Sequence, residues 1–369
     1  MISFCDLRAA HAWRGTAIES ALLRVARSGR YVLGPEVEAF ESEWAALCGA
    51  KHAVGVGNGT DALALILRAA GIGAGDEVIV PAYTAPATWM AVAWTGARPV
   101  CADVDARTAL IDPACAGALV GPATRALVAV HLFGRLAPMG ALAEIAGEHQ
   151  LLLVEDAAQA HGIEEGAGRA GSLGDAAAFS FYPTKTLGAL GDAGAVVTSD
   201  GELADAVRAM RSYGWTSWHG DALAAGTNSR LDELQAAVLR EQLRELAATQ
   251  ELLSALGRRY RDALAELPGV GLPPLPGDGR EPPWHQFAIS LERRAPVRSA
   301  ILERGVQTAV HYDPIPPRLT AFEPAAPAPR AEALAARSLS LPFDPWLTDD
   351  QADAVCEAVV AAVLSSERS

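Results

Sequence analysis

Between about residues 50 and 200, short apolar runs alternate with segments of helical pattern. Runs such as LLLVE and ALVAV are continuously apolar, whereas a strand with one solvated face alternates apolar and polar residues. Continuous runs are typical of a parallel sheet covered by helices on both faces, which predicts an α/β fold. The expected strands are Ala53–Val56, Glu77–Val80, Arg98–Ala102, Ala126–His131, Leu151–Glu155, Ala176–Ser180 and Ala195–Thr198. The expected helices include Asp61–Ala70, Ala85–Thr95, Met139–His149 and Glu202–Ser212.

A smaller second domain is expected in the C-terminal third. The 369 residues, half of them apolar, are enough for a large core and two domains. A helical zone at about 229–267 is followed by the Pro/Gly-rich connector PGVGLPPLPGDGREPP, which cannot be the interior of a helix. After it, WHQFAISLE, RSAILERG and QTAVHY predict strand, helix and strand, and helices are expected near 330–337 and 348–364. We therefore expect a large domain over residues 1–245 and a small one over 246–369.

Charge and cysteine usage exclude several classes of partner. The net charge of −14 argues against nucleic acid and anionic membrane surfaces. No apolar segment approaches the roughly 18 residues of a membrane span, and Asp6 and Arg8 stand where a signal peptide would be apolar. The scattered cysteines contain no CxxC pair, which predicts buried thiols in a reducing cytoplasm and no metal site.

One lysine, Lys185, lies in the otherwise uncharged, glycine-rich and aromatic loop SFYPTKTLGAL. Burial disfavours the charged form of an amine, lowers its pKa and makes it a nucleophile toward carbonyl groups. The neighbouring hydroxyls of Ser180, Tyr182 and Thr184 are suited to phosphate or substrate contacts. The alternative, a solvated loop lysine, fits these apolar surroundings poorly.

A carboxylate is expected near that lysine. In LLLVEDAAQAHG, Asp156 ends a buried strand, at the edge where open α/β sheets bind ligands. A protonated pyridine nitrogen would pair with it and keep a pyridoxal 5'-phosphate (PLP) ring electron-withdrawing. Gln159 and His161 follow closely enough to face the same cavity. The alternatives are that Asp156 caps the next helix and that His161 is a packing residue.

The segment GVGNGTDALAL starts as a glycine-rich turn and becomes a helix. Asn58 or Thr60 can cap that helix, and the unpaired amides at its start favour an anion such as phosphate. A dinucleotide fingerprint does not fit, because Thr60 occupies the place of the third glycine. A plain tight turn is the alternative.

Taken in chain order, these segments resemble the DegT/DnrJ/EryC1/StrS family of sugar aminotransferases, which are PLP enzymes of fold type I. The resemblance runs from GPEVEAFESEW through DEVIVPAYT, VHLFGRLAPM, LVEDAAQAHG, SFYPTKTLGALGDAG and NSRLDELQAAVL to LSLPFDPWLT. It implies a mixed, mostly parallel sheet sandwiched by helices, with a smaller C-terminal α/β domain. It also implies a homodimer with shared active sites.

The resemblance assigns roles by position. Lys185 matches the lysine that binds the coenzyme covalently and later moves the proton, and Asp156 matches the acid paired with the pyridine nitrogen. Gln159 matches the residue near the phenolic oxygen of the coenzyme. The phosphate-binding positions are matched by Gly59, Thr60, Asp61, Ser180 and, from the neighbouring subunit, Asn228. The candidate substrate contacts are Tyr83, His161, Tyr182, Arg230, His311 and Arg318.

Two departures from the family pattern affect the expected site. The family commonly has an aromatic residue two places after the Tyr83 position, stacking on the ring, whereas this chain has Ala85 there. Trp89, one helical turn on, is either a substitute or a core residue. The loop after Tyr213 also lacks the Lys-Tyr pair often seen there, which leaves its substrate contacts open.

The expected reaction is transamination of a nucleotide-linked keto-sugar with L-glutamate as amino donor. The segments FYPTKTLGALGDAG and GVQTAVHYDPIPPRL are most similar to aminotransferases of dTDP-3-keto-6-deoxyhexoses. A 4-keto sugar is the alternative substrate, and a non-catalytic regulatory member of the family is the alternative function. A sugar 3-dehydratase of this family would carry histidine in place of Lys185.

Overall fold

The computed structural model describes residues 1–369 except 167, 218–219, 223, 323–325 and 367–369. Its centre is a seven-stranded sheet with the order β1-β9-β8-β5-β4-β2-β3. The strands are β1 (His52–Val56), β2 (Glu77–Pro81), β3 (Arg98–Ala102), β4 (Thr124–Val130), β5 (Leu152–Asp156), β8 (Ala176–Ser180) and β9 (Gly194–Thr198). Only β9 runs antiparallel to its neighbours, so the sheet is mixed and mostly parallel, as predicted.

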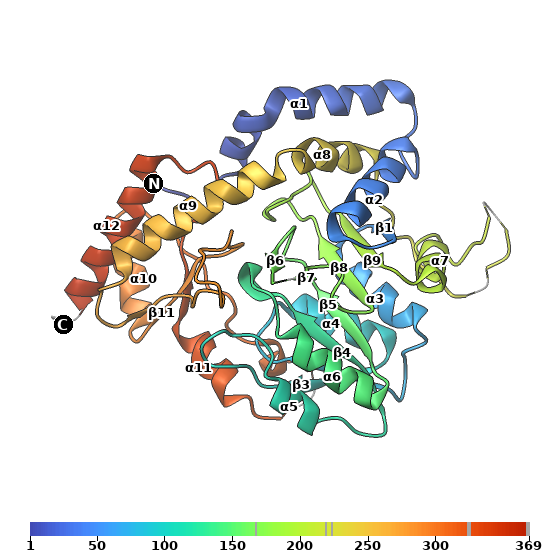
Figure 1. Cartoon of the computed structure of the whole chain (residues 1–369). Helices are drawn as coiled ribbons and strands as arrows, with labels where there is room; N and C mark the ends of the chain where they lie inside the picture. Colours follow the sequence, from blue (N-terminus) through green and yellow to red (C-terminus); the bar gives the residue numbers. More distant parts are fainter. Residues whose placement is uncertain (167, 218–219, 223, 323–325, 367–369) are drawn as a thin grey trace.

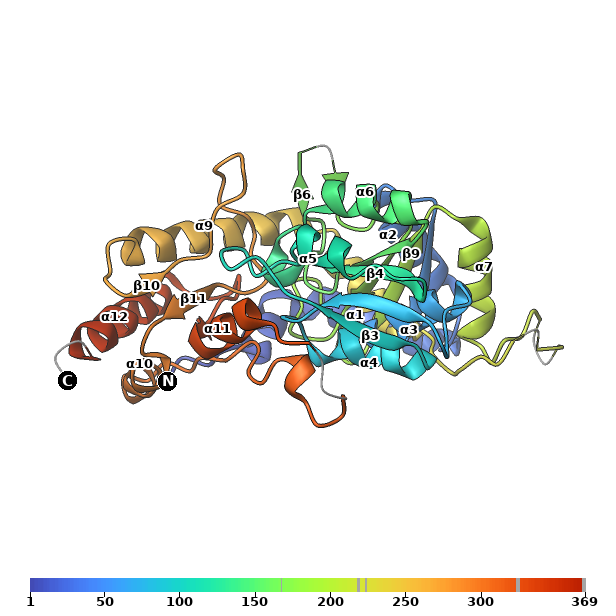
Figure 2. The same cartoon turned by 90° about the horizontal axis from the view of Figure 1, so that it is seen from below.

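Helices cover both faces of this sheet, which explains its continuously apolar strands. Successive side chains of a strand face opposite sides, so Val78 and Val80 pack in one core cluster and Ile79 in another. In Figure 2, α5 and α6 lie on one side of the strands and α3 and α4 on the other. The bounds are α3 (Gly59–Ala69), α4 (Pro86–Thr95), α5 (Pro113–Ala118), α6 (Met139–His149) and α7 (Gly201–Met210). A two-residue hairpin, β6 (Glu164–Glu165) and β7 (Gly168–Arg169), precedes β8.

Two N-terminal helices, α1 (Leu7–Ser28) and α2 (Pro35–Cys48), pack on α8 (Glu233–Leu243), as Figure 1 shows. The Asp6 carboxylate caps the start of α1, and left-handed Gly29 ends it. The guanidinium of Arg14 on α1 donates to Gln242 Oε1 at 3.0 Å, and Gln242 Nε2 donates to the carbonyl of Gly188 at 2.6 Å. Through this chain of contacts α1 supports the loop that carries Lys185.

The C-terminal elements have a core of their own, reached along α9 (Leu246–Leu264) (Figure 1). They comprise the antiparallel strands β10 (Val270–Gly271), β11 (Ala288–Leu291) and β12 (Ser338–Ser340), with α10 (Arg294–Glu303) and α12 (Asp349–Ser366). The helix α11 (Pro329–Arg337) instead packs Ala331 and Ala335 into a core cluster of the large domain. Leu246 packs in a core cluster of the large sheet, whereas Leu253 packs in the C-terminal core. We propose on this basis that the two domains divide near the start of α9.

The strand predicted over QTAVHY is wrong. Ala309 forms one isolated antiparallel bridge with Ser340, and the chain then turns away before Pro314. Residues after this bridge contact the large domain instead of extending the small sheet: the carbonyl of His311 accepts a hydrogen bond from the Tyr83 hydroxyl. The extended apolar pattern of QTAVHY therefore belongs to a segment that crosses between the two domains.

The described residues contain neither a membrane-spanning helix nor a candidate metal cluster. None of the helices there combines the length and apolar character that a membrane crossing needs. In the same part of the chain, no cluster of three or more His, Cys, Asp or Glu side chains could hold a metal ion.

Candidate active site

A cavity of about 430 Å³ lies at the carboxyl ends of β4, β5 and β8. This is the edge where ligands bind in open α/β sheets. The helix starts of α3 and α4 and the loop after β8 complete its wall. The residues that line it include Asn58, Gly59, Thr60, Thr84, Ala85, Trp94, Val130, Asp156, Gln159, Ser180, Tyr182, Thr184, Lys185 and Asp192.

Lys185 is held in the tight loop that follows β8. Its backbone N–H donates to the Tyr182 carbonyl at 2.8 Å, and that of Ala189 donates to Phe181 at 2.8 Å. Gly188 allows the fold-back, since a Cβ there would lie 2.6 Å from the Pro183 carbonyl oxygen. Burial lowers the pKa of the Lys185 amine to about 8, although the Asp156 carboxylate acts in the opposite direction. The amine can therefore lose its proton near neutral pH.

Asp156 is the last residue of β5 and is only 6% exposed. Burial raises the pKa of its carboxyl group, and hydrogen bonds act against that rise. Oδ2 accepts from the Thr88 hydroxyl at 2.8 Å, and Oδ1 accepts from the backbone N–H of Ala158 at 3.2 Å. The preceding Glu155 points to the other face of the sheet, where it is paired with His131 at 2.8 Å. Only Asp156 of this acidic pair lines the cavity.

The start of α3 forms another part of the cavity wall. Asn58 caps this helix by accepting the Asp61 N–H at 2.8 Å, and Gly59 and Thr60 line the cavity. Gly59 packs closely on β8, because a Cβ there would lie 2.7 Å from Ser180 Cβ. The carboxylate of Asp61 accepts from Ser229 Oγ at 2.6 Å and so ties the segment before α8 to this helix start. The exposed amides of a helix start suit a phosphate group.

Gln159 lines the cavity, and both the oxygen and the nitrogen of its side-chain amide form hydrogen bonds. Its Oε1 accepts from the Phe133 N–H at 2.7 Å, and its Nε2 donates to the Tyr312 hydroxyl at 2.9 Å. Tyr312 was not singled out in the sequence, although it follows the candidate His311. Tyr83 lies beside it, with ring centroids 6.4 Å apart. A tyrosine from the C-terminal third thus reaches the cavity wall.

The two candidate histidines occupy different surroundings. His161 is buried among Trp44, Phe179 and Phe181, and its Nε2 lies 2.9 Å from the Ser180 carbonyl. This burial lowers its pKa to about 3, so it packs as a neutral ring. His311 Nδ1 lies 2.9 Å from Ser340 Oγ. Burial and the nearby charge of Lys185 lower its pKa to about 4.

The remaining candidates lie outside the lining of this cavity. Asn228 is exposed, and its Oδ1 accepts from Arg230 Nε at 2.9 Å. Arg318 pairs with Glu332 in the C-terminal domain. Trp89 cannot act as the stacking residue, because it is 1% exposed in the core and its Nε1 donates to the Pro81 carbonyl at 2.9 Å.

Thr84 and Thr88 are site residues that sequence reasoning missed. Thr84 lines the cavity and Thr88 contacts Asp156, and both side chains are almost completely buried. A signal was present: in PAYTAPAT, two threonines four residues apart follow the carboxyl end of an expected strand. Thr88 lies in the first turn of α4 and Thr84 just before that helix, which brings their hydroxyl oxygens within 2.9 Å of each other.

The geometry fits PLP. An amine with a lowered pKa and a buried carboxylate line the same cavity, and the glycine-containing start of α3 provides the third wall. These are the groups needed to bind an aldehyde, a pyridinium nitrogen and a phosphate respectively. Ala85, at the position where the resemblance implied an aromatic stacking residue, lies in the cavity wall and supplies no ring there.

Comparison with known proteins decides the family. The profile of the DegT/DnrJ/EryC1/StrS aminotransferase family matches residues 14–360. The chain belongs to this family. Over 363 residues it is 48% identical to the dTDP-3-amino-3,4,6-trideoxy-alpha-D-glucose transaminase of Streptomyces venezuelae, covering 97% of this chain and 95% of that protein. The predicted family, fold class, aminotransferase activity and PLP dependence are confirmed.

Two further comparisons extend this result. The chain is 44% identical over 365 residues to the erythromycin biosynthesis sensory transduction protein EryC1 of Saccharopolyspora erythraea, covering 98% of this chain and 99% of that protein. The crystal structure of S. venezuelae DesV in complex with a ketimine intermediate has a TM-score of 0.94 at 46% identity, covering 98% of each chain. The likeness to this structure therefore extends over nearly the whole chain.

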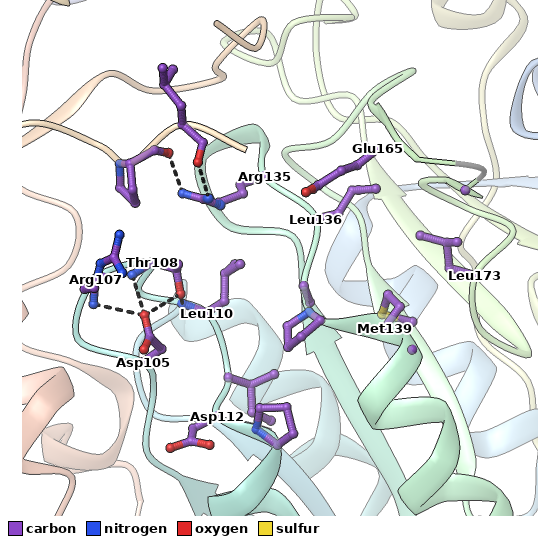
Figure 3. A pocket seen from close by; sticks show the side chains of 18 residues that line it. Asp105, Arg107, Thr108, Leu110, Asp112, Arg135, Leu136, Met139, Glu165 and Leu173 are labelled. Atoms are coloured by element: carbon purple, nitrogen blue, oxygen red, sulfur yellow. Dashed lines mark hydrogen bonds between the residues drawn. The ribbon is translucent and has the colours of Figure 1, made fainter. Parts of the chain in front are cut away.

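A larger cavity of about 720 Å³ lies elsewhere in this aminotransferase (Figure 3). It is formed by the loop after β3, the start of α6 and the hairpin before β8. Its Arg135 donates to the carbonyls of Pro274 and Leu275, and Asp105 accepts from Thr108. These polar groups serve to hold loops together, so the smaller cavity with Lys185 remains the candidate active site.

Proposed function

We propose that this enzyme transfers the amino group of L-glutamate to a dTDP-linked 3-keto-6-deoxyhexose. The observation that carries the proposal is that Lys185 and Asp156 line one cavity at the carboxyl edge of the sheet. PLP, when bound there, supplies an electron sink for the negative charge that develops on the reacting carbon. The protein residues provide binding, orientation and proton transfer.

Lys185 acts first as a nucleophile and then as a base. With a pKa of about 8, a useful fraction of its amine is neutral near physiological pH. With PLP held at this site, Lys185 Nζ would be the group that binds its aldehyde. When free, Nζ would accept the proton of the donor's α-carbon and deliver it to the coenzyme side, and in the second half-reaction it would move a proton in the opposite direction, onto the sugar carbon that receives the amino group.

Asp156 orients the coenzyme ring and keeps its nitrogen protonated. Its two hydrogen bonds, from Thr88 and Ala158, favour the ionised carboxylate against the penalty of burial. An ionised Asp156 keeps the ring nitrogen protonated, and this supports the electron-withdrawing character of the ring. Gly59, Thr60 and Ser180 bind the phosphate from the wall formed by α3 and β8.

We extend the proposal to a homodimer with shared active sites. Asn228 is exposed, and the hydrogen bond between Ser229 and Asp61 fixes its segment next to the start of α3. The resemblance to the family places this exposed side chain at the phosphate of a second copy rather than at that of its own chain. The proposed site of action is the cytoplasm, which suits five cysteines that are all free thiols.

The choice of a 3-keto sugar is supported by the similarity to the transaminase of S. venezuelae, whose name specifies a 3-amino sugar. Tyr83, Tyr182 and His311 are the proposed sugar-side contacts, with Arg230 and Arg318 further out. A 4-keto sugar is the second candidate, because none of these contacts distinguishes the carbon. The regulatory alternative is supported by the name of the related sensory transduction protein.

A direct test uses the chain's two lysines, Lys51 and Lys185. Borohydride reduction of the PLP-loaded protein should fix the coenzyme to the peptide containing Lys185, and mass spectrometry identifies it. Attachment at Lys51 alone, or none, would refute the proposed role. Lys185→Arg keeps the charge but removes the nucleophile, whereas Lys51→Arg is the matched control that should retain activity.

A product assay separates the alternatives. The enzyme is incubated with glutamate and either dTDP-3-keto- or dTDP-4-keto-6-deoxyglucose, and aminosugar nucleotide and 2-oxoglutarate are quantified. Preferential turnover of the 3-keto substrate is expected. Turnover of the 4-keto substrate alone would contradict the proposed regiochemistry, and PLP binding without turnover of either would favour the regulatory alternative.

A further inference from the structure

The side-chain amide of Gln159 has a defined orientation. A backbone N–H can only donate, so the atom 2.7 Å from the Phe133 nitrogen must be the amide oxygen. The amide nitrogen therefore faces Tyr312, and the Tyr312 hydroxyl oxygen accepts its hydrogen bond at 2.9 Å. Because an amide nitrogen carries two hydrogens, one remains for an acceptor in the cavity that Gln159 lines.

The backbone of Phe133 forms a first connection between Gln159 and the C-terminal part of the chain. Its N–H donates to Gln159, and its carbonyl accepts from the His285 N–H at 2.9 Å. Phe133 has a φ of 60°, a left-handed conformation that is costly for a residue with a side chain. At the next position, a Cβ on Gly134 would lie 2.7 Å from the His285 nitrogen. The turn is thus shaped to fit between Gln159 and His285.

Tyr312 provides a second and direct route. It lies in the segment that crosses from the C-terminal domain, where the carbonyl of His311 accepts from the Tyr83 hydroxyl. Burial raises the pKa of the Tyr312 hydroxyl, and the Asp156 carboxylate adds to this effect. The hydroxyl therefore remains protonated and uncharged across the working pH range. The Tyr312 side chain joins this segment directly to a side chain of the cavity wall, that of Gln159.

We propose that Tyr312 is a positioning residue that fixes the amide of Gln159 toward the coenzyme and thereby couples the C-terminal domain to coenzyme binding. The proposal rests on the proposed function in one respect, namely that Gln159 faces the bound PLP. A fixed amide loses little freedom when it meets the coenzyme, so Tyr312 improves affinity without contacting PLP. Coupling between sites is reciprocal, so bound PLP must also order the segment around Tyr312.

A double-mutant cycle on PLP affinity tests the first part. The dissociation constant is measured by visible absorbance for wild type, Tyr312→Phe, Gln159→Ala and the double variant. Tyr312→Phe keeps the ring and should weaken binding by about two- to ten-fold, the range for one neutral hydrogen bond. In the Gln159→Ala background the same substitution should have no further effect. Melting of the apoenzymes checks the fold, and Gln159→Leu replaces Gln159→Ala if the latter is unstable.

Tyr83→Phe is the matched control. It removes a tyrosine hydroxyl that holds the same crossing segment, but this hydroxyl bonds to the backbone of His311 and not to Gln159. Its effect on the dissociation constant should be equal in the presence and absence of the Gln159 side chain. A Tyr312→Phe effect that is likewise equal in both backgrounds would overturn the proposal. If Gln159→Ala leaves PLP affinity unchanged, the placement of Gln159 in the proposed function fails instead.

Hydrogen exchange tests the second part on the wild-type chain. Addition of PLP should slow amide exchange in peptides covering residues 305–315, and this slowing should be lost in Gln159→Ala. The visible band of bound PLP should also titrate at a different pH in Tyr312→Phe, which a merely structural tyrosine would not cause. Equal slowing with and without the Gln159 side chain would contradict the coupling.

Discussion

The hydroxyl of Thr88 donates a hydrogen bond to Asp156 Oδ2 across 2.8 Å. A carboxylate can only accept, so the second contact of this hydroxyl, 2.9 Å from Thr84 Oγ1, must be one in which Thr84 donates. The three groups form a buried chain with one proton arrangement. Thr88 thus stabilises the ionised form of an acid whose burial favours the neutral form.

Thr88→Val should weaken PLP binding and catalysis because it removes that donor while keeping the shape of the side chain. A hydrogen bond to a charged group contributes about 1.5–3 kcal/mol, so a loss of roughly tenfold or more in affinity is expected. The pKa of Asp156 should rise further, which moves the acid limb of kcat/KM to higher pH. Thr88→Ser keeps the hydroxyl and should retain most activity. An unchanged acid limb in Thr88→Val would show that the contact does not matter.

The lowered pKa of Lys185 predicts a pH dependence of apoenzyme stability. Its pKa is about 8 when folded, against an ordinary value of 10.5. Between these values the unfolded chain holds a proton that the folded chain has released, so the Lys185 contribution to the free energy of unfolding rises with pH. Denaturant titrations of wild type and Lys185→Met from pH 7 to 11 measure it. The free energy of unfolding of wild type minus that of Lys185→Met should increase with rising pH. The corresponding difference for Lys51→Met should show no such trend.

Gly59→Ala should disturb the contact between α3 and β8. The added Cβ would lie 2.7 Å from Ser180 Cβ, so the helix start or the strand end must move. Overpacking of this kind costs about 1–3 kcal/mol in the free energy of unfolding, and PLP affinity should fall with it. Gly147 in α6 has no atom within 4 Å of its Cβ position. Gly147→Ala is therefore the control, and it should be neutral or stabilise by about 1 kcal/mol. Equal effects of the two substitutions would argue against a close approach at Gly59.

Asn228→Ala tests whether active sites are shared between subunits. Alone it should reduce PLP affinity, and Lys185→Ala alone should be inactive. Mixed and allowed to exchange subunits, the two variants should recover about a quarter of wild-type activity, because half of the dimers are mixed and each has one intact site. The measurement is aminosugar formation after co-refolding. Recovery no greater than the sum of the separate variants would place Asn228 outside the partner's site.

The sheet of the large domain was predicted well from sequence, because its signal is local. Each buried strand is a continuous apolar run, and the helix Met139–His149 and the strands Arg98–Ala102 and Ala176–Ser180 were predicted with the bounds that the structure gives. The helix Leu7–Ser28 was not predicted, since its apolar residues follow a weak pattern: Ile18 and Val25 are buried, whereas Trp13 and Leu23 are exposed. The prediction of a strand over QTAVHY was wrong. Only Ala309 of the segment forms a bridge to the small sheet, and the residues after it cross to the large domain.

Sequence alone determined the family, the α/β sheet and the residues that end its strands, among them Asp156 before the loop of Lys185. The sheet was predictable because apolar runs and loop composition are properties of neighbouring residues, and the family because its motifs occur in order along the chain. The tertiary structure decided the contacts of Thr88 with Asp156, 68 positions away, and of Gln159 with Tyr312, 153 positions away. Such hydrogen bonds depend on how the two domains and several strand ends are arranged in space. A local sequence pattern contains no information about that arrangement.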